Sequence, residues 1–380
     1  MKKLLATIII FLSAQQALAC DAVIEKFSRD CWMQDRLAKI REEYAKIGVD
    51  VDEIGEYKVL RFIDRNSWEK AKTFKKAPLE IYDPAPATWR VWERGIDSLF
   101  RNKQNKNILF SQPIDKFTFA HINTVLLTDG TTSIKDRITD QSKKPGEFRS
   151  NFDKGVGFCA GNENENNYRQ GIKRSEDSME RFQKRWESLL GVEFSDIVKK
   201  ENGPNPRRAD LKSGMYVSSA TCRNGNGVFI GYSPSNHVGD QIEWIRIFIK
   251  SNLEAYQRGE PVLAPIELAA VVQKWFVSTH PFADGNGRTS RGIQELIMAN
   301  FGLPFVPAGD LQNDAMEEVE KYVENTYNKL DSMLTELEMC IKKRDGWRIP
   351  RSCRTIDELN KGSADEDENE YQQQQIQNGG

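Results

Sequence analysis

The chain has 380 residues, of which 39% are hydrophobic and 29% are charged, a composition typical of a globular protein with a sizeable core. This composition excludes a fibrous protein and a protein built from membrane-spanning helices. The formal net charge is only −2 at neutral pH, so there is no electrostatic basis for nucleic acid as a partner.

Residues 1–19 have the pattern of a bacterial secretory signal peptide. The start is positively charged, residues 4–12 are almost wholly apolar, and residues 17–19 (Ala-Leu-Ala) have the small side chains of a cleavage site. The apolar run is too short for a permanent anchor. We therefore expect an exported protein, periplasmic or secreted, that is cleaved before Cys20. A membrane location is the alternative if Cys20 carries a lipid.

The six cysteines form an even set, which in an exported protein favours disulfides. Cys340 and Cys353 flank a short segment with an Asp-Gly turn at 345–346, so they are the first predicted pair. Buried free thiols are the alternative for several of the six. The chain has no Cys-x-x-Cys motif and only three histidines, so a structural zinc site is not expected.

Apolar side chains recur every three or four residues around 37–47, 89–99 and 179–189, which predicts helices with one buried face. The segment 140–173 is rich in Gly, Asn, Lys and Glu and is predicted to be a long loop or insertion. Beyond residue 363 the chain becomes acidic and then glutamine-rich, and we expect it to be disordered.

The stretch from Met215 to Tyr232 differs from these helical segments. Two short runs of β-branched and aromatic residues flank Asn-Gly-Asn-Gly at 224–227, which predicts a β-hairpin. After it, apolar periodicity predicts helices over 241–256, 265–277, 287–302 and 315–341.

Residues 280–291 (His-Pro-Phe-Ala-Asp-Gly-Asn-Gly-Arg-Thr-Ser-Arg), here called the loop motif, join two of these helices. Gly285 and Gly287 around Asn286 allow successive backbone N–H groups to converge on an anion. The helix that begins there adds its positive N-terminal dipole. This part of the motif therefore predicts a phosphate site.

Charged side chains complete the loop motif. Arg288 and Arg291 are three residues apart, so both guanidinium groups can lean over the same phosphates. Asp284, a lone carboxylate beside bound phosphates, is expected to bind Mg²⁺. His280 is expected to take a proton from a hydroxyl that attacks phosphorus, and Phe282 to anchor the loop in the core. Each residue alone has an ordinary structural explanation, but their concentration within twelve positions favours a catalytic site.

The loop motif resembles the signature of the Fic family, His-Pro-Phe-x-Asp/Glu-Gly-Asn-Gly-Arg-x-x-Arg, at every fixed position. The resemblance implies a mainly α-helical domain that transfers AMP from ATP, with Mg²⁺, to a Tyr, Thr or Ser hydroxyl of a target protein. It implies that His280 is the general base and Asp284 the metal ligand. The phosphate-binding residues that it implies are Gly285, Asn286, Gly287, Arg288 and Arg291.

With this resemblance, we expect five parts along the chain. They are a signal peptide (1–19), a helical N-terminal region (20–111), a Fic-type helical bundle with a β-hairpin flap (112–342, with an insertion around 140–212), a C-terminal segment (343–362) and a disordered tail (363–380). The hairpin at about 215–232 is similar to the family's flap, which grips the main chain of a target protein by strand addition.

Many family members carry an inhibitory helix with the sequence Ser/Thr-x-x-x-Glu-Gly/Asn, and this chain has no such sequence. Three alternatives follow: inhibition by a partner protein, inhibition by a divergent element, or no inhibition.

Other functions are compatible with the loop motif. A Fic-type enzyme can transfer UMP or phosphocholine, or remove AMP. Members that transfer phosphate have lysine in place of the second motif glycine, so Gly287 argues against that reaction. A non-catalytic exported interaction module is disfavoured because His280 and both arginines are present. Since a periplasm offers little ATP, an exported AMP transferase is expected to act after delivery into a host or prey cell.

Overall fold

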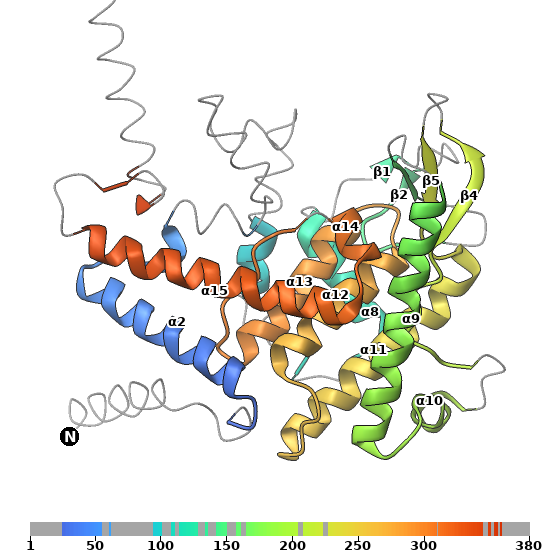
Figure 1. The fold of residues 1–380 in the computed structure, drawn as a ribbon, viewed down its shortest axis with the longest axis horizontal. Coiled ribbons are helices and arrows are strands. Elements are labelled where there is room, and N and C mark those ends of the chain that lie inside the picture. The colour runs from blue at the N-terminus through green and yellow to red at the C-terminus, as the bar shows by residue number, and fades with distance from the viewer. Residues whose placement is uncertain are drawn as a thin grey trace, which may run out of the picture.

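Helices form most of the described chain, with two small antiparallel sheets beside them (Figure 1). The computed structural model describes residues 25–54, 61, 94–100, 108–110, 114–127, 134–135, 142–149, 157–160, 165–203, 208–222, 227–309, 311–344, 349–350, 353–355 and 358. The expected mainly α fold class is confirmed. The predicted signal peptide and the predicted tail lie outside the described residues.

Helix α12 (Pro265–Thr279) lies at the centre of the core. All of its residues are buried except Glu267, and most of them are apolar. Its neighbours are α8 (Lys116–Leu127), α11 (Ser235–Gln257), α13 (Asn286–Asn300) and α15 (Val319–Arg344). Helix α12 packs against α11, α13 and α15, while α8 packs against α13 and α11. The predicted helices at 241–256, 265–277 and 287–302 are confirmed.

Helix α2 (Ser28–Lys46) runs alongside α15, although the two are nearly 300 positions apart in the sequence (Figure 1). Arg36 forms ion pairs with Asp331 and Glu338, and the Tyr44 hydroxyl donates to the Leu337 carbonyl at 3.2 Å. The short 3-10 helix η1 (Val51–Glu53) follows. The predicted stripe at 37–47 is buried at Leu37, Ile40 and Tyr44, but Ile47 lies just past the end of α2 and is 47% exposed.

The predicted loop at 140–173 is wrong in part. It contains strands β2 (Ser142–Lys143) and β3 (Gly157–Ala160), as well as the beginning of α9 (Glu165–Leu190). The first turns of α9 are polar, which hid the helix from hydrophobic periodicity, and an ion pair from Arg169 to Glu165 one turn earlier supports them. The short helix α10 (Phe194–Asn202) follows α9.

The predicted hairpin is confirmed as β4 (Tyr216–Thr221) and β5 (Val228–Gly231), which pair antiparallel. A third strand was not predicted: β3 pairs with the other edge of β5, so the order in the sheet is β3-β5-β4. Strand β5 is therefore central, and β3 and β4 are the two edges. A separate ribbon pairs β1 (Ile134–Lys135) with β2.

The predicted helix at 315–341 is two helices, α14 (Leu311–Met316) and α15. Two serine hydroxyl groups of helix α9 form hydrogen bonds with the backbone on either side of the break between them. Ser178 Oγ accepts the Val319 N–H at 2.9 Å and thus caps α15, while Ser175 Oγ donates to the Ala315 carbonyl at 3.1 Å. The break depends on contacts with a distant segment, so local periodicity could not reveal it.

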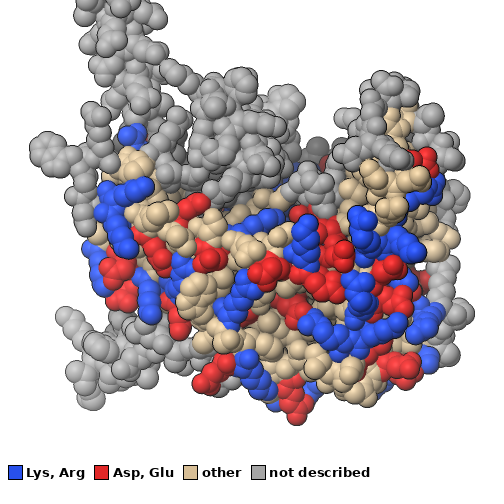
Figure 2. Space-filling model, viewed as in Figure 1, with Lys and Arg blue, Asp and Glu red and all other residues tan. Residues whose placement is uncertain are grey.

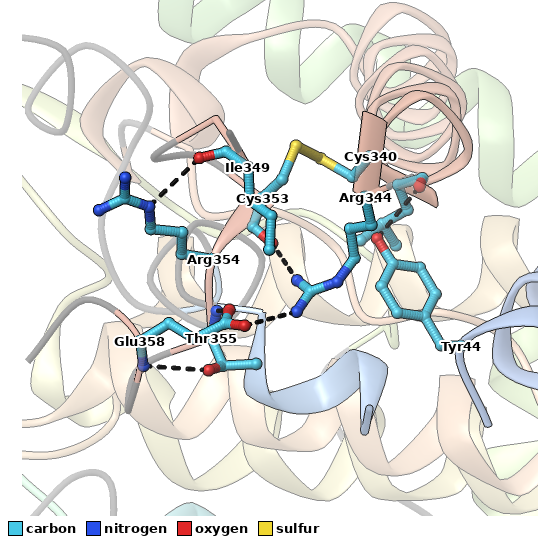
Figure 3. The surroundings of a disulfide bond; sticks show 9 residues. Tyr44, Cys340, Arg344, Ile349, Cys353, Arg354, Thr355 and Glu358 are labelled. Carbon is cyan, nitrogen blue, oxygen red and sulfur yellow. Dashed lines mark hydrogen bonds and ion pairs between the residues drawn. A yellow bond between two sulfur atoms is a disulfide. The ribbon is translucent and has the colours of Figure 1, made fainter. Parts of the chain in front are cut away.

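The predicted Cys340–Cys353 disulfide is present (Figure 3). Arg344, one turn after Cys340, donates to the Cys353 carbonyl at 2.6 Å and forms an ion pair with Glu358 at 2.7 Å. A second disulfide, Cys159–Cys222, joins the two edges of the three-stranded sheet and was not predicted. Cys31 is also disulfide-bonded.

Acidic and basic side chains are interspersed on the face shown in Figure 2, so this face presents no large region of one sign. Within the described residues, no helix combines the length and the hydropathy needed to cross a membrane.

Asp30 is a buried carboxylate that connects three helices. It accepts hydrogen bonds from the Ile266 N–H at the start of α12 (2.8 Å) and from the Tyr327 hydroxyl on α15. Burial raises the pKa of Asp30 from 3.8 to about 6. Since the folded state holds this proton more tightly than the unfolded state, the free energy of unfolding falls as pH rises through this interval.

We expect Asp30→Asn to remove this pH dependence. The amide oxygen still accepts from Ile266, and the amide nitrogen can donate to the Tyr327 oxygen. Between pH 4 and 7 the wild-type protein should lose up to roughly 3 kcal/mol from this residue, a loss absent from the variant. Urea unfolding at both pH values measures the difference. If the free energy of unfolding changed equally between pH 4 and pH 7 in the two proteins, Asp30 would not be the source of this pH dependence.

Candidate active site

The loop motif begins where α12 ends. His280 has φ 52° and ψ 59° and is the one non-glycine residue in the left-handed region within the described chain. Its N–H donates to the Phe276 carbonyl at 3.0 Å, which closes the last turn of the helix. This backbone conformation costs on the order of 1 kcal/mol for a residue with a Cβ. Surrounding contacts must therefore hold it.

Phe282 anchors the loop motif in the core, as predicted. Its side chain is buried, and its ring stacks on Phe148 with ring centroids 4.7 Å apart. The two residues also form an isolated antiparallel β-bridge. The segment just before residue 150 thus pairs directly with the motif, a contact that the sequence analysis, which assigned this segment to a long loop or insertion, did not predict.

Asn286 is buried, and its side chain closes the loop motif on itself. Oδ1 accepts the Phe282 N–H at 2.8 Å, and Nδ2 donates to the Phe282 carbonyl at 2.9 Å. Both groups of the amide are therefore used within the protein. The backbone N–H of Asn286 lies at the start of α13, where a helix N-terminus can bind an anion.

Asn123 on α8 holds the motif from outside, and sequence analysis did not identify it. Its Nδ2 donates to the Asp284 carbonyl at 3.1 Å and to Thr289 Oγ1 at 2.9 Å, while its Oδ1 accepts the Gly146 N–H at 2.7 Å. A single asparagine at mid-helix carries no sequence signal for such a role.

The charged residues of the motif differ in exposure. The Asp284 side chain is 52% exposed and lies 3.4 Å from Arg288. Arg291 is buried, and its Nη2 donates to the Gly309 carbonyl at 2.7 Å in the segment before α14. The structure thus brings Asp284 and Arg288 together and directs one nitrogen of Arg291 to a backbone oxygen.

Asp284 fits the predicted metal role by its donor type and exposure. One oxygen accepts the Gly285 N–H at 2.7 Å. No group of three His, Cys, Asp or Glu side chains that could hold a metal occurs in the described part of the chain. Mg²⁺ bound by one carboxylate together with phosphate oxygens is compatible with this arrangement.

The His280 ring stacks on Tyr232, with ring centroids 3.8 Å apart and planes within 7°. Nδ1 lies 3.3 Å from the Val277 carbonyl, and since a carbonyl only accepts, this contact requires the proton on Nδ1. Burial, together with the charge of Arg149, lowers the pKa of His280 to about 3. The imidazole is therefore neutral near pH 7, and the Nε2 lone pair can accept a proton.

Gly285, at φ 76°, allows the close approach of the motif to α8. A Cβ at this position would meet Leu127 Cδ2 at 2.7 Å. Gly48 has a similar φ of 70° with nothing within 4 Å, which makes it a matched control.

We expect both glycine-to-alanine variants to lose about 1 kcal/mol through backbone strain. Gly285→Ala should lose a further 1–3 kcal/mol, approximately, through overpacking against Leu127. Urea unfolding measures both values. Equal destabilisation by the two substitutions would show that the close packing of Gly285 against Leu127 does not affect the free energy of unfolding.

Comparisons with known proteins agree with the loop motif. Residues 210–298 match the model of the Fic/DOC family. The chain is 35% identical over 66 residues to a Fido domain-containing protein of Dictyostelium discoideum and 34% identical over 67 residues to the protein adenylyltransferase fic-1 of Caenorhabditis briggsae. These alignments cover 17% and 18% of this chain, and 46% and 11% of the two relatives.

A solved structure of a Fic domain-containing signaling protein from Bacteroides thetaiotaomicron aligns with 87% of this chain and 99% of its own, at 13% identity and a TM-score of 0.40. The family match spans the hairpin, α11, α12, the loop motif and most of α13. Residues 210–298, which include the loop motif, therefore match the Fic/DOC family.

Proposed function

We propose that this Fic-type transferase moves AMP from ATP to a hydroxyl side chain (Tyr, Thr or Ser) of a target protein. The observation that carries the proposal is the combination of a neutral, oriented His280 with an intact phosphate loop in a Fic/DOC domain. A relative that carries the name protein adenylyltransferase supports the choice of AMP.

The proposed reaction is a displacement at the α-phosphorus of ATP. His280 Nε2 takes the proton of the target hydroxyl, whose oxygen forms the new bond to phosphorus. The bond from this phosphorus to the bridging oxygen breaks, and pyrophosphate leaves. Backbone N–H groups at the start of α13, beginning at Asn286 and Gly287, are proposed to bind the α- and β-phosphates. Arg288 and Arg291 are proposed to stabilise the charge on the leaving pyrophosphate.

Mg²⁺ held by Asp284 and the phosphates would neutralise charge on the nucleotide when bound. The exposed carboxylate supports this role because a metal bound there can remain open to phosphate oxygens.

The three-stranded sheet is the proposed contact for the target. Strand β5 has partners on both edges, so a target segment can add only to β3 or to β4. Tyr232 directly follows β5, and its ring stacks on His280. The end of β5 therefore lies next to the residue proposed as the general base. Such pairing uses backbone groups and is compatible with many target sequences.

A partner protein that inhibits the enzyme is also proposed, since the chain lacks the family's inhibitory sequence.

Incubation with Mg²⁺ and ATP labelled at the α-phosphorus tests the proposal. We expect label on a protein in an added lysate, and a loss of rate by a factor of about 10² to 10⁴ in His280→Ala. His121→Ala, in a histidine of α8 outside the motif, serves as the matched control. Label from γ-labelled ATP would indicate phosphate transfer, and label from UTP alone would indicate UMP. ATP binding without transfer of any label to the lysate would contradict the proposal.

We further propose that the protein is exported and acts after delivery into a host or prey cell. Residues 1–19 and the need for ATP support this. We expect the isolated protein to begin at Cys20 and AMP-modified targets to appear in the recipient cell, both measurable by mass spectrometry. Protein confined to the producing cell, with no modified target elsewhere, would contradict it.

A further inference from the structure

Arg149 lies just outside the loop motif and is buried against it, with 4% of its surface exposed. Its N–H donates to the Pro281 carbonyl at 2.8 Å, next to the bridge between Phe148 and Phe282. Two neighbouring residues, 148 and 149, thus attach one short segment to the backbone of the motif. This attachment fixes where the Arg149 side chain begins.

The guanidinium group of Arg149 donates to three backbone carbonyls. Nε donates to His280 at 2.6 Å, and Nη2 donates to Thr279 at 3.0 Å and to Ser233 at 2.8 Å. The first two belong to the C-terminal end of α12, where unsatisfied carbonyls and the helix dipole favour a cation. The planar fork of arginine can serve such divergent acceptors, whereas a lysine ammonium on its flexible stem cannot reproduce the geometry.

The third carbonyl gives the interaction its significance for the site. Ser233 follows Tyr232, the residue whose ring stacks on His280. One guanidinium therefore fixes the backbone beside both rings of the stack. It connects the end of the sheet strand β5 to the end of α12, and it stabilises the left-handed conformation of His280.

We propose that Arg149 is a positioning residue that sets the orientation of His280 and ties it to the base of the three-stranded sheet. What the oriented histidine is used for rests on the proposed function, but the orientation itself does not. Arg149 is not one of the residues proposed to bind the phosphates of ATP. An effect of its substitution on transfer can therefore be distinguished from an effect on ATP binding.

The test uses the histidine ring signals in ¹H–¹³C NMR spectra of the purified protein. The chain has only three histidines, so His280→Ala assigns the His280 signal. Stacking on Tyr232 should give this signal a ring-current shift in the wild type. Arg149→Lys should move the signal toward the position of an unstacked ring and broaden it. Arg246→Lys is the matched control, because Arg246 is also buried and also donates to a backbone carbonyl, that of Ile114.

The activity arm separates positioning from binding. Arg149→Lys should reduce kcat for AMP transfer by about a hundredfold, the scale of a misplaced catalytic group, with the Kd for ATP unchanged. Transfer undetectable in the wild type would remove the proposed function, while the ring signals would still test the position of His280. An unchanged His280 signal in Arg149→Lys would overturn the inference.

Arg149→Gln provides a second variant that retains a donor for the His280 carbonyl. If neither Arg149 variant folds while Arg246→Lys does, as judged by circular dichroism, the residue stabilises the whole domain. That result would also overturn a specific positioning role.

Discussion

The end of α12 is the constraint on which the candidate site depends. This helix is buried on nearly every side, so its direction is fixed by packing, and the chain must turn sharply to return along α13. The turn is made by a left-handed residue that carries a Cβ, and that residue is His280. The most strained backbone position in the loop motif and the proposed general base are therefore the same residue.

Several separate hydrogen bonds stabilise this turn. Asn286 closes the loop from inside, Asn123 attaches it to α8, and Arg149 neutralises the end of the helix. These hydrogen bonds are made to backbone groups and, from Asn123, also to the buried Thr289 hydroxyl, so none depends on the identity of the exposed residues in the loop. The site can thus keep its shape while the Asp284 side chain is exposed.

The N-terminal end of α12 is also held by side chains from other helices. Asp30 on α2 accepts the Ile266 N–H, and Tyr327 on α15 donates to the same carboxylate. A residue from the beginning of the described chain therefore caps the helix whose other end bears His280. Arg61 adds a second link, since it pairs with the buried Glu295 one turn after Arg291 on α13. The N-terminal region is thus joined to both helices that flank the loop motif.

Much of the helical fold could be predicted because its signals are local. The apolar stripes of α11, α12 and α13 and the Gly-rich sequence that predicted the pairing of β4 with β5 depend on neighbours a few residues apart. Strand β3, the break before α15 and the role of Arg149 could not be predicted, since each depends on a partner far away in the sequence. In the site, the loop motif identified the chemical groups but not their supports. Asn286 is an example, because the hydrogen bonds of its side chain to both backbone groups of Phe282 could not be predicted from the motif.

The disulfide between Cys159 and Cys222 makes the segment between them a closed ring of 63 positions, which includes α9, α10 and β4. A cut in any loop of this ring would leave both pieces covalently attached to the domain. The ring also lowers the chain entropy of the unfolded state, a contribution of about 4 kcal/mol for a loop of this size. A protein that folds in an oxidising compartment and later enters a reducing one would lose this contribution. The stability of the domain therefore depends on the redox state of its surroundings.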